Sequence, residues 1–345
     1  MQEFTVKSKT AFSTQRNFEV AEQILKSFND LSPAARAHLL NSLKRSDEKI
    51  RVKESASIVK SADDLIAEYK DKQLVFEGLP TGIPTLDKYL LGLKQGDVLV
   101  VGAYTGLGKS TLLMYMALYL QTQGVNSVMF ALEDSEYEVG TRAAFLSIGN
   151  NELAQPHTGQ MFLFGKDGVP LLYKNKFAFI PAVEAVVAAK GVKVVFLDML
   201  NDILDPISDK DADDFMVELK YLADRLGIVM VITSRLREPA GLSEKTRRLE
   251  RVFPSEDALY GRSMIKFLAT KIITIAESPT YPYEPATGMS KHETRHLCIH
   301  VVKNRLGKTT KGLGGAVGVS LVRSTVLMSL KDNGFEQILG GEDEI

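Results

Sequence analysis

The spacing of hydrophobic positions divides the chain into two parts with different patterns. In the first part, apolar residues recur at helical spacing over 18–28. Ser32 and Pro33, as an N-cap and a first-turn proline, open a second helix that runs to Leu43, and a capping signal begins a third helix at about 62–72. The stretch 77–84 is rich in Gly and Pro, which favours turns over regular structure. We therefore predict the main domain boundary near residue 75.

The second part alternates hydrophobic runs of strand length with amphipathic stretches of helical length. The runs predicted as strands are Val98–Val101, Ser127–Leu132, Val192–Leu197, Ile228–Ile232, Ile272–Ala276, His296–Val302 and Val319–Leu330. The stretches predicted as helices include Ser110–Gln123, Val183–Ala189 and Phe215–Leu226. This alternation is typical of an α/β domain with a largely parallel sheet.

These signals predict four segments along the chain. They are a helical N-terminal region of unknown role over 1–60, a linker helix over 61–76, an α/β domain over 77–335 and an acidic tail over 336–345. A chain of 345 residues is long enough for a sizeable buried core in the α/β domain.

Composition and charge narrow the class of protein. The 42 basic and 43 acidic residues nearly balance, so any nucleic-acid site must be a local patch rather than a generally basic surface. The single cysteine, Cys298, excludes an internal disulfide framework and fits a reducing compartment. The polar N-terminus and the absence of an apolar run of membrane-spanning length favour a soluble cytoplasmic protein without a membrane partner.

A predicted strand-to-helix junction carries the pattern of a phosphate-binding loop. The strand at Val98–Val101 leads into a match to G-x-x-x-x-G-K-[ST] in which alanine takes the first position. The nucleotide-binding residues predicted there are Ala103, Tyr104, Thr105, Gly106, Leu107, Gly108, Lys109, Ser110 and Thr111. Backbone N–H groups of such a loop, together with the start of the following helix, surround phosphates. We expect Lys109 to pair with the β- and γ-phosphates of ATP or another nucleoside triphosphate, and Ser110 to hold Mg²⁺.

Carboxylates at the ends of two other predicted strands complete this chemistry. The hydrophobic run Val192–Leu197 ends in Asp198, which is expected to reach the Mg²⁺ as the acid of a Walker B strand. Glu133 follows the strand Ser127–Leu132 and is the candidate base that polarises the attacking water. From the chemistry of the residues, Asp134 and Glu136 remain rivals for that role.

The motifs together resemble the DnaB family of hexameric replicative helicases. The resemblance is carried by Leu79–Asp97, by the phosphate loop and by Ala131–Ser135, and it is strongest to phage-type members, including the helicase half of phage primase–helicases and Twinkle. It implies a RecA-like P-loop NTPase core, and it implies that the glutamate at position 133 is the catalytic base. It also implies an ATP-dependent DNA helicase of DNA replication that forms a ring, moves 5′ to 3′ on single-stranded DNA and works with a separate primase or helicase loader. If a phage encodes the chain, its location is the host cytoplasm.

Two later motifs extend the resemblance. The family's γ-phosphate sensor, usually Gln or His, aligns with Arg235 in Ile232–Pro239, and this departure leaves open whether Arg235 senses phosphate or pairs with a carboxylate. Val302–Lys308 is similar to the family's Lys-x-Arg element, which enters the neighbouring subunit's nucleotide site. The resemblance implies that Arg305 is an arginine finger and Lys303 its companion, although a solvated basic hairpin tip is the alternative.

A basic segment after the sensor strand is the predicted DNA-binding loop. Its DNA-binding residues are Arg237, Lys245, Arg247, Arg248 and Arg251. Basic side chains there would neutralise DNA phosphates, and the lack of an aromatic residue before Phe253 favours backbone contacts over base stacking. A solvated surface loop is the other interpretation.

Two other functions share parts of these motifs. A RecA-like recombinase or repair ATPase that forms filaments would share the core but lack a Lys-x-Arg element near the C-terminus. A nucleotide-dependent loader or scaffold would need no hydrolysis, whereas Lys109, Glu133 and Asp198 are all present. The sequence therefore favours an NTP-driven ring helicase.

Overall fold

The computed structural model describes residues 61–63, 78–166, 178–238, 251–261, 263–281, 283–285, 292–310, 313–324 and 327–338. Contacts divide the chain into two units, Met1–Val75 and Phe76–Ile345, and every element named below belongs to the second unit. The helices predicted at 18–28 and 32–43 lie outside the described residues, as does most of the helix predicted at 62–72.

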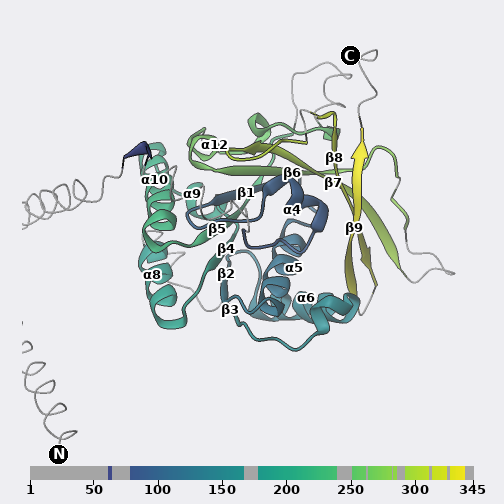
Figure 1. Ribbon diagram of the computed structural model, residues 1–345, viewed down its shortest axis with the longest axis horizontal. Helices are drawn as coiled ribbons and strands as arrows, with labels where there is room; N and C mark the ends of the chain where they lie inside the picture. Colours follow the sequence, from purple (N-terminus) through teal and green to yellow (C-terminus); the bar gives the residue numbers. More distant parts are fainter. Residues whose placement is uncertain are drawn as a thin grey trace, which may run out of the picture. The chain divides into compact units, whose positions relative to one another are not determined.

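Within the described residues, nine strands form one mixed sheet in the order β3-β2-β4-β5-β1-β6-β7-β8-β9 (Figure 1). The strands are β1 (Val98–Ala103), β2 (Ser127–Ala131), β3 (Met161–Gly165), β4 (Val194–Asp198), β5 (Val229–Arg235), β6 (Lys271–Glu277), β7 (Glu293–Asn304), β8 (Gly315–Arg323) and β9 (Met328–Gln337). The strands from β3 to β6 in this order pair in parallel, whereas β7, β8 and β9 are antiparallel. The predicted α/β class with a largely parallel sheet is therefore confirmed.

Helices cover the two faces of the sheet (Figure 1). Those packed with one face are α4 (Pro84–Leu90), α5 (Lys109–Thr122) and α6 (Glu136–Gly149), and those packed with the other are α8 (Phe179–Lys190), α9 (Asn201–Leu204), α10 (Asp209–Leu226) and α12 (Met264–Leu268). Alternate residues of a strand point to opposite faces. In β1, accordingly, Leu99 and Val101 join the core beneath α5, while Val98 and Val100 join the core beneath α10. The continuous apolar run of this strand thus reflects burial on both sides.

Two local predictions are corrected, and two elements were missed. The run Val319–Leu330 is not one strand: β8 ends at Arg323, β9 begins at Met328, and Ser324 N–H donates to the Leu327 carbonyl between them. The sequence between the two strands contains no Gly, Pro or Asn, which commonly mark turns, so the pattern did not reveal the break. Strand β3 and helix α6 were not predicted. The last strand, β9, ends at Gln337, two residues into the segment predicted as an acidic tail.

The two ends of the parallel strands form two chemically different edges of the sheet. Parallel strands end together at one edge, where β1, β4 and β5 reach Ala103, Asp198 and Arg235. At the opposite edge, where β1 begins, Asp97 forms a buried ion pair with Lys271, and Thr270 Oγ1 donates to Asp97 at 2.7 Å.

Among the helices that the structure describes, none combines the length and the apolar character that crossing a bilayer requires.

Candidate nucleotide-binding site

The phosphate loop lies between β1 and α5. Gly106 and Gly108 have φ values of 82° and 84°, in the left-handed region that glycine enters without steric cost. Gly108 is the N-cap of α5, so the free N–H groups of the first helical turn begin directly after it. Ala103, at the first position of the motif, is still within the extended strand, where a methyl group is accommodated. The alanine is therefore compatible with the loop conformation.

Lys109 reaches back across this loop. Its ammonium donates to the Ala103 carbonyl at 3.0 Å and to the Tyr104 carbonyl at 3.4 Å. Burial lowers the pKa of Lys109, while the carboxylates of Asp198 and Glu133 act in the opposite direction. A cation held by neutral carbonyls can exchange those weak partners for phosphate oxygens.

Asp198 ends β4 and is buried, with 5% of its surface exposed. Thr233 Oγ1, on the neighbouring strand β5, donates to Asp198 Oδ1 at 2.6 Å. This bond orients the carboxylate from behind. Such second partners are typical of carboxylates that bind metal ions.

Glu133 lies in the segment that follows β2, next to Leu132, whose N–H donates to the Asp198 carbonyl at 2.6 Å. Arg235, at the end of β5, donates to Glu133 Oε1 at 2.8 Å, and both side chains are nearly half exposed. The two rivals for the catalytic base, Asp134 and Glu136, have other contacts: the first pairs with an arginine of α6 at 2.7 Å, and the second opens α6 directly after its N-cap. Of the three acids, Glu133 is the one that lines the same cavity as Lys109.

A cavity of about 440 Å³ brings together Lys109, Glu133 and Arg235. Its lining comprises Thr105, Gly106, Gly108, Lys109, Ser110, Thr111, Glu133, Arg142, Met199, Arg235 and Arg323. Six of the predicted nucleotide-binding residues and two of the predicted catalytic residues therefore share one concave surface.

Sequence reasoning missed two arginines of this cavity. Arg142 lies on α6, and Arg323 ends β8 with a carboxylate oxygen of Glu293 4.0 Å from its guanidinium. The capping box Ser135-x-x-Glu138 was visible in the sequence and places Arg142 in the second turn of a helix. No local signal marked Arg323, because its position depends on the pairing of β8 with β7.

Asp202 was also missed. Its Oδ2 atom is buried and has no hydrogen-bond partner. Burial, together with the charge of Glu133, raises the pKa of Asp202 to about 6, although Arg235 acts in the opposite direction. The end of the sheet that holds the cavity thus also contains an acid with one buried carboxylate oxygen that has no hydrogen-bond partner.

Lys303 and Arg305 do not lie near this cavity. Lys303 donates to the Lys266 carbonyl, and Arg305 Nη2 donates to the Phe267 carbonyl at 3.0 Å. Arg305 N–H bonds the Thr270 carbonyl, and Thr270 N–H in turn bonds the carbonyl of Val98, at the start of β1. The phosphate loop begins at the other end of β1, roughly 17 Å away at about 3.3 Å per residue. Arg305 is therefore separated from the phosphate loop of its own chain by the length of a strand.

The predicted DNA-binding loop is described only at its two ends. Arg237 Nη2 donates to the Gly261 carbonyl at 2.8 Å, and Arg251 pairs with Glu238 at 2.8 Å on the surface. Lys245, Arg247 and Arg248 lie outside the described residues. A smaller cavity of about 260 Å³ is lined by both Arg251 and Tyr104, so the base of this loop adjoins the phosphate loop.

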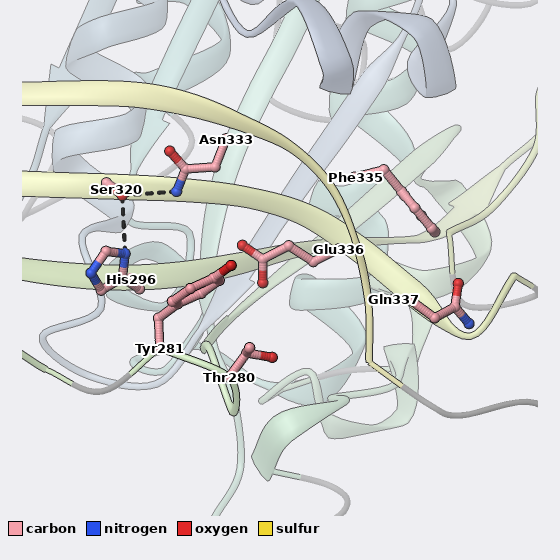
Figure 2. Close-up of a pocket in the computed structure, with 8 residues that line it drawn as sticks. All are labelled: Thr280, Tyr281, His296, Ser320, Asn333, Phe335, Glu336 and Gln337. Carbon is pink, nitrogen blue, oxygen red and sulfur yellow. Dashed lines mark hydrogen bonds between the residues drawn. The ribbon is translucent and has the colours of Figure 1, made fainter.

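A third cavity, of about 450 Å³, lies on the antiparallel part of the sheet (Figure 2). There His296 Nδ1 lies 3.1 Å from Ser320 Oγ, which also accepts a hydrogen bond from Asn333 at 2.8 Å. Leu297 and Leu321 join the core beneath α5, so by strand alternation His296 and Ser320 face the opposite side of the sheet. None of the predicted site residues lines this cavity.

Comparisons with known proteins agree with the motifs. Residues 78–161 match the family described as DnaB-like helicase C terminal domain. The replicative DNA helicases DnaB of Helicobacter pylori strains 26695 and J99 are 36% and 34% identical to the chain over 87 residues. The aligned stretch covers 25% of this chain and 18% of each of these relatives.

Solved structures show the same fold at low sequence identity. One is a DnaB-like replicative helicase, described with its interactions with primase, which has a TM-score of 0.59 and 16% identity and covers 94% of this chain and 77% of that one. Another is an ATPase domain, with a TM-score of 0.53 and 16% identity over 76% of this chain and 95% of that one. The fold is therefore that of the RecA-like ATPase domain, and the chain is similar to the DnaB family of replicative helicases, as its motifs predict.

Proposed function

We propose that the chain is an NTP-driven replicative DNA helicase that forms a ring, a hexamer as in the DnaB family, and moves 5′ to 3′ on single-stranded DNA to unwind duplexes. The observation that carries this proposal is the division of catalytic groups between two edges of the sheet. Lys109, Glu133 and Arg235 share one cavity, while Arg305 lies at the opposite edge. A site that needs all four is completed only when two chains meet.

In this proposal the loop and Lys109 bind the phosphates of ATP or another nucleoside triphosphate. Glu133 accepts a proton from the attacking water, and Arg235 contacts the γ-phosphate as the sensor. Arg305, with Lys303 beside it, stabilises the negative charge of the transition state in the neighbouring chain's site. The arginine of one chain thereby couples hydrolysis to contact between chains.

Ser110 and Asp198 are the residues that would hold Mg²⁺. Both supply hard oxygen donors, as this ion requires, and the bond from Thr233 already orients the Asp198 carboxylate. When bound, the ion neutralises phosphate charge in the transition state.

DNA binding is assigned to the segment that follows β5. The residues that would contact DNA phosphates are Arg237, Lys245, Arg247, Arg248 and Arg251. The cavity that Arg251 and Tyr104 both line supports this assignment, because it brings one end of the segment next to the phosphate loop. A separate primase or helicase loader is the further partner we propose, in the cytoplasm of the cell or of a phage's host.

Assembly on forked DNA tests this function. We expect mass photometry with a non-hydrolysable ATP analogue to show closed hexamers on the single-stranded arm, and a strand-displacement assay with ATP to show unwinding that starts from a 5′ tail. Filaments that lengthen along the DNA would instead identify a recombinase. Binding without ATP hydrolysis would identify a loader or scaffold.

A further inference from the structure

The cavity contains an ion pair that spans it. Arg235 and Glu133 meet at 2.8 Å although they follow β5 and β2, which are separated in the sheet by β4. The pair therefore crosses in front of the strand that ends in Asp198. Both of its members line the same cavity as Lys109.

This pair conflicts with the proposed work of both residues. The Oε1 atom of Glu133 accepts a hydrogen bond from the guanidinium, which uses one lone-pair site of the carboxylate and holds it toward Arg235 instead of toward an attacking water. A guanidinium that is bonded to a carboxylate also has fewer donors for a phosphate. Both residues are therefore better placed for the proposed chemistry once the pair has opened.

The surroundings of Arg235 allow it to change partners without moving its strand. Its backbone N–H donates to Asn201 Oδ1 at 3.1 Å, and its carbonyl accepts a hydrogen bond from Tyr260 at 2.7 Å. The side chain beyond this fixed backbone is 44% exposed. A long, solvated side chain on an anchored backbone can swing from one acceptor to another within the same cavity.

We propose that Arg235 is a positioning residue that exchanges Glu133 for the γ-phosphate when a nucleoside triphosphate binds. The exchange releases Glu133 to contact water only when the γ-phosphate is present. A diphosphate offers no such acceptor, so the Arg235–Glu133 pair persists in its presence. This inference rests on the proposed function, because it takes the cavity to be the nucleotide site.

The exchange predicts a coupling between the two side chains that depends on the nucleotide. Glu133→Gln removes the competing partner, so a non-hydrolysable triphosphate should bind more tightly, by up to about fivefold for an exposed pair. In an Arg235→Gln background the same substitution should raise the affinity for the triphosphate only slightly. The affinity for ADP should rise only slightly in either background. Isothermal titration calorimetry with Mg²⁺ and without DNA measures all four proteins.

Asp134→Asn is the matched control. It removes one negative charge from the adjacent residue, leaves the Arg235–Glu133 pair intact and releases Arg142, which also lines the cavity. Any change in affinity that it causes should therefore be the same with and without Arg235. If Glu133→Gln acts only by reducing repulsion of phosphates, its gain will be equal with and without Arg235, or equal for ADP and the triphosphate. Either result overturns the exchange.

A separate variant distinguishes failure of the exchange from failure of the proposed site. Lys109→Ala should weaken binding of both nucleotides, since it removes the main side-chain partner of the phosphates. If Lys109→Ala binds both nucleotides as the parent does, the cavity is not the nucleotide site and the proposed function fails with it. If Lys109→Ala weakens binding but the coupling is absent, only the exchange is wrong.

Discussion

The two edges of the sheet hold acids in opposite circumstances. Asp97, at the edge where β1 begins, pairs with the buried Lys271 and accepts a hydrogen bond from Thr270. Asp202, after the end of β4, has a buried oxygen with no hydrogen-bond partner, and burial raises its pKa to about 6. The acid at the first edge has a buried cationic partner, whereas Asp202 at the other edge has one buried oxygen without a partner.

Within one fold, one edge of the sheet therefore contributes to stability and the other to ligand binding. Unsatisfied polar groups cost stability and are concentrated where ligands bind. Strand β7 connects the two edges: Arg295, near its start, donates to the Gly106 carbonyl in the phosphate loop at 3.2 Å, while Arg305 follows its far end. The same strand therefore contacts its own chain's phosphate loop and, in the proposed ring, presents a residue to the next chain.

The largest effect is expected at the cavity edge from Lys109→Ala. Nucleotide hydrolysis should fall to background, because the phosphates lose their main side-chain partner. The thermal midpoint should stay near that of the parent, since Lys109 bonds only loop carbonyls among the contacts described above. Steady-state phosphate release and thermal unfolding measure the two. Hydrolysis equal to the parent's would show that the catalytic edge has been misassigned.

At the opposite edge, the expected effect is on stability. Asp97→Asn leaves Lys271 as an unpaired buried charge and should lower the free energy of unfolding by about 3–5 kcal/mol. Adding Lys271→Met removes that charge and should recover part of the loss. Chemical denaturation measures both variants. If the single and double variants are equally stable, the pair does not act as a unit.

Asp202→Asn tests the cost of the unsatisfied acid. Because the folded-state pKa of about 6 lies above the unfolded value near 4, the parent loses stability as pH rises from about 4 to 6. The variant should therefore be more stable than the parent above pH 6, by a gain on the order of 1–3 kcal/mol, and equal to it below pH 4. Thermal unfolding between pH 4 and pH 8, without nucleotide, follows this difference. A gain that does not vary with pH would refute the assignment.

The smallest effect is expected from the basic segment that follows β5. Arg247→Ala with Arg248→Ala should weaken single-stranded DNA binding and reduce its salt slope by roughly 1.4, at about 0.7 per lost phosphate contact. Fluorescence anisotropy at several salt concentrations gives the slope. Lys210→Ala with Lys220→Ala, on α10, removes the same charge elsewhere and should leave the slope unchanged. Equal slopes for all three proteins would place the DNA site in another part of the chain.

Features set by local sequence were predicted well. The hydrophobic run before the phosphate loop indicated strand β1, and the order of the glycines and Lys109 indicated the loop itself. Glu133 and Asp198 were predicted at strand ends, and the structure has Glu133 lining the cavity and Asp198 at the end of β4. These signals are local because a buried parallel strand and its terminal acid lie within about ten residues of sequence.

Features set by packing between distant segments were not predicted. Arg323 reaches the cavity only because β8 pairs with β7, and the burial of Asp202 depends on the elements packed around it. The distance of Arg305 from its own phosphate loop follows from the antiparallel pairing of β7 with β6. Sequence patterns describe each strand separately and do not state which strands become neighbours.

The central claim is that the two edges form one active site only when two chains meet. Arg305→Ala alone should reduce hydrolysis by roughly 10³- to 10⁵-fold, with nucleotide binding retained. Mixing Arg305→Ala with Lys109→Ala tests the claim directly, because a Lys109→Ala chain still supplies Arg305 to an intact loop on its neighbour. We predict that hydrolysis returns on mixing and rises with protein concentration. No recovery at any ratio, with mixed rings shown to form, would contradict a shared site and leave Arg305 as a surface charge.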